Sequence, residues 1–250
     1  MNDVAVITGA ASGIGGATVR RLLGKGYKVL GVDTARMEET EDLGWVTGDV
    51  SAASTWQAVD EALTRRQWQP SALVVAAAYL EVGNVLQLSD DAWAKTIGVN
   101  LMGLVFSVRC VLPGMIKRGR GSVVTIGSID SYMAEQGLVS YCSSKGAILQ
   151  FTRALAMDHA RQGVRANCVS PGVTDTPFFR RHLATAKDPE TFLRGREQRN
   201  PIGRLLDPDE VASTVVYLLS DDASGMTGAN LVVDGGLTVG FDFRTGAGGD

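Results

Sequence analysis

Short apolar runs alternate along this chain with longer segments in which apolar residues recur at helical spacing. Seven of the short runs are typical of buried parallel strands, at 4–7, 27–32, 44–47, 72–76, 122–126, 165–169 and 229–233. Helices are predicted at 13–23, 53–66, 90–118, 140–162 and 207–219. Strands that alternate with helices predict an α/β fold, a parallel sheet with right-handed crossovers and helices on both faces.

One long segment, 174–206, breaks this alternation. Ordered insertions of this kind tend to be binding loops, so we expect a lid over a substrate site. Between residues 178 and 206 there are seven Lys or Arg and three Asp or Glu, a net charge of +4. An anionic substrate and a solvated helix face both explain this charge. No change of composition marks a linker, so residues 1–250 are interpreted as one domain.

Composition narrows the functional classes. The chain has 250 residues, 45% of them hydrophobic, 30 glycines and a formal net charge of −3, which gives no reason to expect nucleic-acid or membrane binding. The longest apolar runs have the length of strands, and the N-terminus lacks an export signal, so a cytoplasmic protein is expected. Cys110, Cys142 and Cys168 are interpreted as buried free thiols. His159 and His182 lie far apart, and no metal site is expected.

The pair Tyr141 and Lys145 is the first candidate for chemistry. Four residues make about one helical turn, so the phenol and the ammonium group share one helix face. A neighbouring lysine is expected to lower a tyrosine pKa that starts near about 10. Ser128, thirteen residues before Tyr141, could bind an oxygen that the tyrosine protonates. These residues predict a proton-transfer site for an alcohol or a carbonyl.

A glycine-rich turn, Thr8-Gly-Ala-Ala-Ser-Gly-Ile-Gly15, follows the first strand and opens the first helix. Its glycines would let a phosphate approach the helix N-terminus, although such turns also use glycine for packing alone. Asp33 ends the second strand, 24 residues after Gly9. A carboxylate there accepts hydrogen bonds from ribose hydroxyls and repels a 2′-phosphate, so NAD is favoured over NADP even though Arg36 lies close by.

Together these motifs resemble the short-chain dehydrogenase/reductase family. Thr8-Gly-x-x-x-Gly-Ile-Gly15, Ser128, Tyr141-x-x-x-Lys145 and Ser170-Pro-Gly172 occur in order and at the family's spacings, and the resemblance extends from Val4 to about Gly236. It implies a single Rossmann-type, doubly wound sheet of seven strands in the order 3-2-1-4-5-6-7.

The resemblance also implies the site. The catalytic residues would be Asn100, Ser128, Tyr141 and Lys145, with Tyr141 as general acid/base, Lys145 on the nicotinamide ribose and Asn100 positioning a water. The implied cofactor-binding residues are Gly9, Ser12, Gly13, Ile14, Gly15, Asp33, Asp49, Val50, Ala76, Ala77, Ala78, Tyr141, Lys145, Pro171, Gly172, Val173, Thr174 and Thr176.

One departure from the family pattern follows the fourth strand, where Ala76-Ala77-Ala78 replaces the usual Asn-Ala-Gly. Alanine still offers its backbone groups, but the side-chain bonds of the asparagine are absent. Cofactor binding is expected to survive this change.

The residues expected to line the substrate pocket are mostly apolar, which favours a hydrophobic or cyclic alcohol. They are Tyr79, Leu80, Ile129, Met133, Val173, Phe178 and Phe179, and the two phenylalanines could equally serve only to anchor the lid.

The sequence therefore predicts an NAD-dependent oxidoreductase that interconverts a secondary alcohol and its ketone. An NADP-linked 3-oxoacyl or carbonyl reductase and a catalytically silent dinucleotide-binding regulator remain alternatives. A homotetramer is expected through helices 90–118 and 140–162, and Phe241 and Phe243 of the C-terminal segment could reach a neighbour or belong to a loose tail.

Overall fold

The computed structural model describes residues 3–240. Its seven strands form one parallel sheet in the order β3-β2-β1-β4-β5-β6-β7, which confirms the predicted order. The strands are β1 (Val4–Thr8), β2 (Lys28–Asp33), β3 (Leu43–Thr47), β4 (Pro70–Val75), β5 (Gly121–Ile126), β6 (Val164–Pro171) and β7 (Asn230–Val233).

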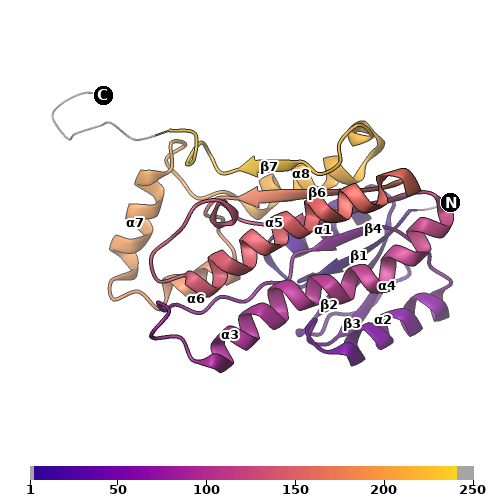
Figure 1. Cartoon of the computed structure of the whole chain (residues 1–250), viewed down its shortest axis with the longest axis horizontal. Coiled ribbons are helices and arrows are strands. Elements are labelled where there is room, and N and C mark those ends of the chain that lie inside the picture. The colour runs from indigo at the N-terminus through magenta and orange to yellow at the C-terminus, as the bar shows by residue number, and fades with distance from the viewer. Residues whose placement is uncertain (1–2, 241–250) are drawn as a thin grey trace.

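Successive strand residues point to opposite sides of the sheet, and in the central strands the side chains on both sides are apolar. Helices therefore cover both faces. In β1, Val4 and Val6 belong to the apolar cluster under α2 (Ala53–Arg66), α4 (Gly103–Arg118) and α5 (Val139–His159). Ala5 and Ile7 belong to the other cluster, under α1 (Gly13–Leu23) and α8 (Pro208–Leu219). Figure 1 shows α4 and α5 in front of the sheet.

The long predicted helix 90–118 is interrupted. It consists of α3 (Asp90–Ile97), a π-helical turn (Gly98–Met102) and α4, and Ser89 caps its start by accepting from the Ala92 N–H. By length and composition alone this 29-residue helix could cross a membrane, since an 18-residue window within it has a mean hydropathy of 1.7, a property that the apolar runs did not reveal. In the structure its inward side packs on β4, β5, α2 and α5.

The lid segment is more regular than the sequence indicated. It holds α6 (Pro177–Leu183) and α7 (Pro189–Arg199), each with a proline at its first residue and an N-cap side chain, Thr176 or Asp188. Leu206 N–H donates to the Val173 carbonyl, so the two ends of the lid are joined at its base. Both helices lie at the left of Figure 1, where the strands end.

The expectation that all three cysteines are buried needs correction. Only Cys168 is fully buried, whereas Cys110 and Cys142 are half-buried free thiols. Phe241 and Phe243 lie outside the described residues. Among residues 3–240, no group of three His, Cys, Asp or Glu could hold a metal ion.

Candidate functional site

One cavity of about 840 Å³ opens where the strands end. It extends from the turn after β1 and the end of β2, past β4 and β5, to the lid helix α6. In a parallel α/β sheet, this edge is where ligands bind. All the predicted cofactor residues line the cavity, and of the predicted catalytic residues only Asn100 does not.

The glycine turn leaves the N-terminus of α1 open. Its N-cap, Ser12, makes no side-chain bond to the helix, and the first turn contains no acidic residue. The first N–H groups of α1 therefore face the cavity without a capping side chain, an arrangement suited to phosphate. Gly9 has a φ of 65°, and a Cβ on Gly15 would lie 2.1 Å from the Gly9 carbonyl oxygen, so the turn depends on glycine at both positions.

The carboxylate of Asp33 is fixed at the end of β2. One oxygen accepts from the Ala11 N–H at 3.1 Å and the other from the Ala35 N–H at 3.0 Å. These bonds tie the glycine turn to β2 and hold the carboxylate at the cavity wall. Asp49 is held similarly by the Ser51 N–H at 2.8 Å, beside Val50.

The loop after β4 is held without the asparagine that the family pattern leads one to expect. The Thr8 hydroxyl accepts from the N–H groups of Ala76 and Ala77 at 3.0 and 3.2 Å. Asn100 then binds both backbone groups of Tyr79, accepting from its N–H at 2.7 Å and donating to its carbonyl at 2.9 Å.

Asn100 lies in the π-helical turn, 1% exposed, and does not reach the cavity. Its second amide proton goes to the Ser144 hydroxyl at 2.9 Å, so both protons are used within the protein. The side chain therefore fastens the loop after β4 to α5. The predicted role in positioning a water remains untested.

Tyr141 and Lys145 share one face of α5, and Ser128 approaches them from the end of β5. All three are buried, and all three line the cavity. The Lys145 ammonium donates to the Ile126 carbonyl at 2.8 Å and lies 5.4 Å from the centre of the Tyr141 ring. The structure thus brings a hydroxyl, a phenol and an ammonium group to one end of the cavity.

The electrostatics of Tyr141 differ from the expectation. Burial raises its pKa, and the negative charge of Asp130 raises it further, while the adjacent Ser128 hydroxyl acts in the opposite direction. Lys145 does not offset the effect of burial, so the predicted lowering of the tyrosine pKa by this lysine is wrong for the protein alone. Burial also lowers the pKa of Lys145, to about 8.

The cavity wall between α1 and the lid comes from the end of β6. Gly172 N–H donates to the Val233 carbonyl at 2.9 Å, which keeps this turn against β7. Thr176 packs on the glycine turn, since a Cβ on Gly13 would lie 3.2 Å from its methyl group. Pro171, Val173 and Thr174 complete this wall.

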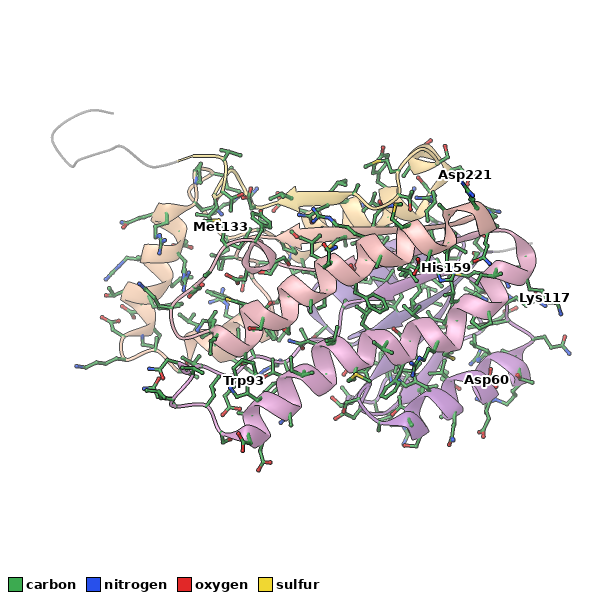
Figure 2. All side chains as sticks on the ribbon, viewed as in Figure 1. Asp60, Trp93, Lys117, Met133, His159 and Asp221 are labelled. Carbon is green, nitrogen blue, oxygen red and sulfur yellow. The ribbon has the colours of Figure 1, made fainter. Side chains whose placement is uncertain are left out.

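The prediction that Met133 lines the substrate pocket is wrong. Met133 is 51% exposed and does not line the cavity, as its surface position in Figure 2 illustrates. Ile129 and Phe178 do line it, and the Phe178 ring centre lies 6.1 Å from that of Tyr141. Phe179 both lines the cavity and anchors the lid, because it packs with Leu183 in the core of the lid.

The cavity wall also contains ionisable side chains: Lys95, Asp130, Glu135, Arg181, His182 and Arg196. Sequence reasoning counted Arg181 and Arg196 in the positive charge of the lid but missed the other four. Asp130 could have been found from its place two residues after Ser128. Nothing in the sequence pairs Glu135 with Arg196, yet their side chains form an ion pair between the loop after Ser128 and α7. This pair and the Arg180–Asp175 pair neutralise part of the lid's positive charge.

Comparison with known proteins agrees with this geometry. Residues 9–238 match the family model described as enoyl-(acyl carrier protein) reductase. The chain is 34% identical to 2-(S)-hydroxypropyl-CoM dehydrogenase 3 of Xanthobacter autotrophicus, over 95% of this chain and 97% of that protein. It belongs to the short-chain dehydrogenase/reductase family.

Other relatives also match this chain over nearly its whole length. Meso-2,3-butanediol dehydrogenase of Serratia marcescens is 33% identical, over 95% of each chain. The ligand-free structure of the aldohexose dehydrogenase of Thermoplasma acidophilum superimposes with a TM-score of 0.91 at 30% identity, covering 98% of this chain and 97% of that one. The chain is accordingly an NAD(P)-dependent oxidoreductase that acts on a small molecule.

The close approach at Gly15 gives a first prediction. Gly15→Ala is expected to weaken cofactor binding and to lower the free energy of unfolding by about 1–3 kcal/mol, because the methyl group meets the Gly9 carbonyl. Gly16→Ala is the matched control, since a Cβ there meets nothing closer than 3.4 Å. Thermal unfolding and NADH titration of both variants test this, and equal effects would show that the turn tolerates a side chain.

Proposed function

We propose that this protein is an NAD-dependent dehydrogenase that interconverts a secondary alcohol and its ketone. The observation that carries the proposal is the continuity of the cavity. It joins Asp33 and the uncapped N-terminus of α1 at one end to Tyr141, Ser128 and Lys145 at the other. A dinucleotide bound along it would place its adenosine ribose near Asp33 and its reactive ring near Tyr141.

The cofactor, when bound, supplies the hydride acceptor for oxidation or the donor for reduction. The chain supplies the proton transfer. In oxidation Tyr141 takes the proton of the substrate hydroxyl, and in reduction it returns a proton to the developing alkoxide. Ser128 holds the same oxygen, and Lys145 holds the ribose hydroxyls near the reacting carbon.

The cavity walls near Tyr141 support a cyclic or largely hydrophobic alcohol. Leu80, Ile129, Val173 and Phe178 provide apolar surface there. Relatives named for cyclic and vicinal alcohols agree with this substrate class. One is the 2,5-dichloro-2,5-cyclohexadiene-1,4-diol dehydrogenase LinX of Sphingobium indicum, 30% identical, and another is the butanediol dehydrogenase.

The cofactor proposal is NAD because Asp33 would face the 2′-position of the adenosine ribose. The alternative is an NADP-linked reductase, a class represented by the actinorhodin polyketide ketoreductase solved with NADPH, with a TM-score of 0.87 and 30% identity. The negative charge of Asp33 opposes this alternative.

An anionic substrate group is a second candidate feature, because Arg181 lines the cavity and forms no ion pair with any residue between 3 and 240. A relative of Comamonas testosteroni, 35% identical, is named 4-formylbenzenesulfonate dehydrogenase. Comparing the turnover of neutral and carboxylated analogues across ionic strength tests this feature, and equal rates would exclude it.

We also propose a cytoplasmic homotetramer that is built through α4 and α5. Met102, in the π-helical turn just before α4, and Met157, in α5, are 36% and 83% exposed, and burial of such apolar side chains would stabilise association. Sedimentation of the purified protein checks the state of assembly.

The function is tested by following NADH absorbance while cyclic, aromatic and open-chain secondary alcohols are offered with NAD or NADP. Reduction of NAD by at least one class is the expected result. A protein that binds NADH but transfers no hydride with any alcohol or ketone would be the silent regulator instead.

The pKa of Lys145 gives a second prediction. NADH binding is expected to weaken as the pH rises through about 8, because the lysine then loses the charge that the bound ribose favours. The sign follows from linkage: a ligand that prefers the protonated lysine binds less tightly above the pKa of the free protein. Fluorescence titration between about pH 6.5 and 9.5 measures this. Lys145→Met should bind NADH more weakly without this dependence, and an identical slope in the variant would contradict the assignment.

A further inference from the structure

Asp130 places a carboxylate next to the proposed catalytic serine. It lies in the short 3-10 turn Ile129–Ser131, half-buried, and lines the cavity. The Asp130 N–H donates to the Ser128 hydroxyl oxygen at 3.0 Å, and the Ser128 hydroxyl donates to Oδ2 of Asp130 at 3.1 Å. The carboxylate is therefore one hydrogen bond away from the group that holds the reacting oxygen.

The other carboxylate oxygen, Oδ1, has no donor among residues 3–240, although its neighbours are charged. Glu135 from the same loop and Tyr141 from α5 face Asp130, as do the cations of Arg196 from α7 and Lys145 from α5. Burial raises the pKa of Asp130, and Glu135 adds to this, whereas Ser128, Arg196 and Lys145 act in the opposite direction. Oδ1 is not one of the described side-chain atoms that are buried without a partner, so it is open to the cavity and free to accept a hydrogen bond from a ligand.

We propose that Asp130 binds a second hydroxyl group of the substrate, on the carbon next to the reacting carbon. The substrate class is then a vicinal diol, with the corresponding α-hydroxy ketone as product. This inference rests on the proposed function and narrows its substrate. An ammonium group in the same place is disfavoured because Lys145 and Arg196 already bring positive charge to Asp130.

The hydrogen bonds also show how the second hydroxyl would assist the reaction. Ser128 has a single proton, and in the structure that proton goes to Asp130. A substrate hydroxyl that donates to Oδ1 offsets part of the carboxylate's charge and weakens the bond from Ser128 to Oδ2, so the Ser128 proton can turn to the reacting oxygen. A simple alcohol lacks this second donor and leaves Ser128 engaged with Asp130.

The test compares cis- and trans-1,2-cyclohexanediol with cyclohexanol, using NAD and the purified full chain. The measured quantity is the ratio of kcat/KM for the preferred diol to kcat/KM for cyclohexanol. A hydrogen bond to a charged acceptor predicts a ratio of about 10 to 100 in the wild type. In Asp130→Ala the ratio is expected to fall toward one, and in Asp130→Asn it is expected to fall part of the way, since a neutral amide oxygen is a weaker acceptor.

Glu135→Gln is the matched control, because it removes the other carboxylate of the same loop but not the one bonded to Ser128. Its diol ratio is expected to stay at the wild-type value. An equal fall in both variants would assign the preference to the charge of the loop and overturn the proposal. NADH binding of each variant reports that the cofactor site is intact, and Asp130→Asn carries the test should Asp130→Ala fail to fold.

Failure of this inference differs from failure of the proposed function. Equal kcat/KM values for diol and cyclohexanol in the wild type would overturn the vicinal-diol assignment and leave an alcohol dehydrogenase. If the wild type binds NADH but transfers no hydride from any alcohol, the proposed function is wrong and this inference fails with it.

Discussion

Replacing Tyr141 with phenylalanine is expected to lower kcat by about 10²- to 10⁴-fold while NADH affinity changes little. The ring that packs at 6.1 Å from Phe178 remains in the variant, so only the hydroxyl is lost. Without it, the substrate hydroxyl loses the group to which we assign its proton. Steady-state rates with the best alcohol of the panel, together with NADH titration, measure both quantities.

Tyr132→Phe is the matched control for this substitution. Tyr132 belongs to the loop that connects Ser128 to α5, is 46% exposed and does not line the cavity, so its hydroxyl contacts no proposed substrate or cofactor position. Turnover of this variant should match the wild type. Near-normal turnover of Tyr141→Phe would remove Tyr141 from the role of acid/base.

The pH profile distinguishes proton transfer from a packing effect. Burial raises the pKa of Tyr141, so its phenolate forms only at high pH in the protein alone, and a positive nicotinamide ring nearby would favour it. Alcohol oxidation by the wild type is therefore expected to rise with pH. In Tyr141→Phe this rise should be absent from the residual rate.

Local patterns were sufficient to predict which residues line the end of the cavity where we propose that the dinucleotide binds. The turn after β1, the acid at the end of β2 and the Tyr–Lys spacing each depend on a few neighbouring residues and on one periodicity. The sheet then brings these segments together, since parallel strands place their carboxyl ends at one edge. For this reason Asp33 and Gly9, far apart in sequence, line the same cavity.

The substrate end could not be predicted in the same way, because it depends on contacts between distant segments. The turn after β5 is set by Ser131, whose hydroxyl accepts from the Ser128 N–H at 3.1 Å. This cap directs Asp130 toward the cavity and leaves Met133 at the surface. The contact of the lid with this loop depends on Arg196, 61 residues after its partner Glu135.

The pKa of Tyr141 illustrates the same limit in energetic terms. A lysine one turn away suggested a lower value, but the largest effect is burial, which depends on the whole fold. The π-helical turn at Asn100 is a further case, because a continuous helical pattern gives no sign of a wider turn. Its consequence, the clamp on the backbone of Tyr79, is visible only in three dimensions.

Removing the charge of Asp33 is expected to lower the preference for NAD over NADP by about 10²-fold. The wild-type carboxylate would face the 2′-position of the ribose, where it accepts from hydroxyls and repels a phosphate. Asp33→Asn removes the charge and keeps an oxygen that can accept from the Ala11 N–H, so the glycine turn stays tied to β2. NADP should therefore gain in kcat/KM while NAD loses.

Asp33→Ala separates this charge effect from the structural role. It also removes the acceptors of the Ala11 and Ala35 N–H groups, so it is expected to weaken both cofactors and to lower the melting temperature relative to Asp33→Asn. Glu38→Ala is the control for charge alone, because Glu38 is exposed, follows the same strand and does not line the cavity. The ratio of kcat/KM with NAD to that with NADP should stay at the wild-type value in Glu38→Ala. An unchanged ratio in Asp33→Asn, or a wild type that prefers NADP, would contradict the role of Asp33 in cofactor choice.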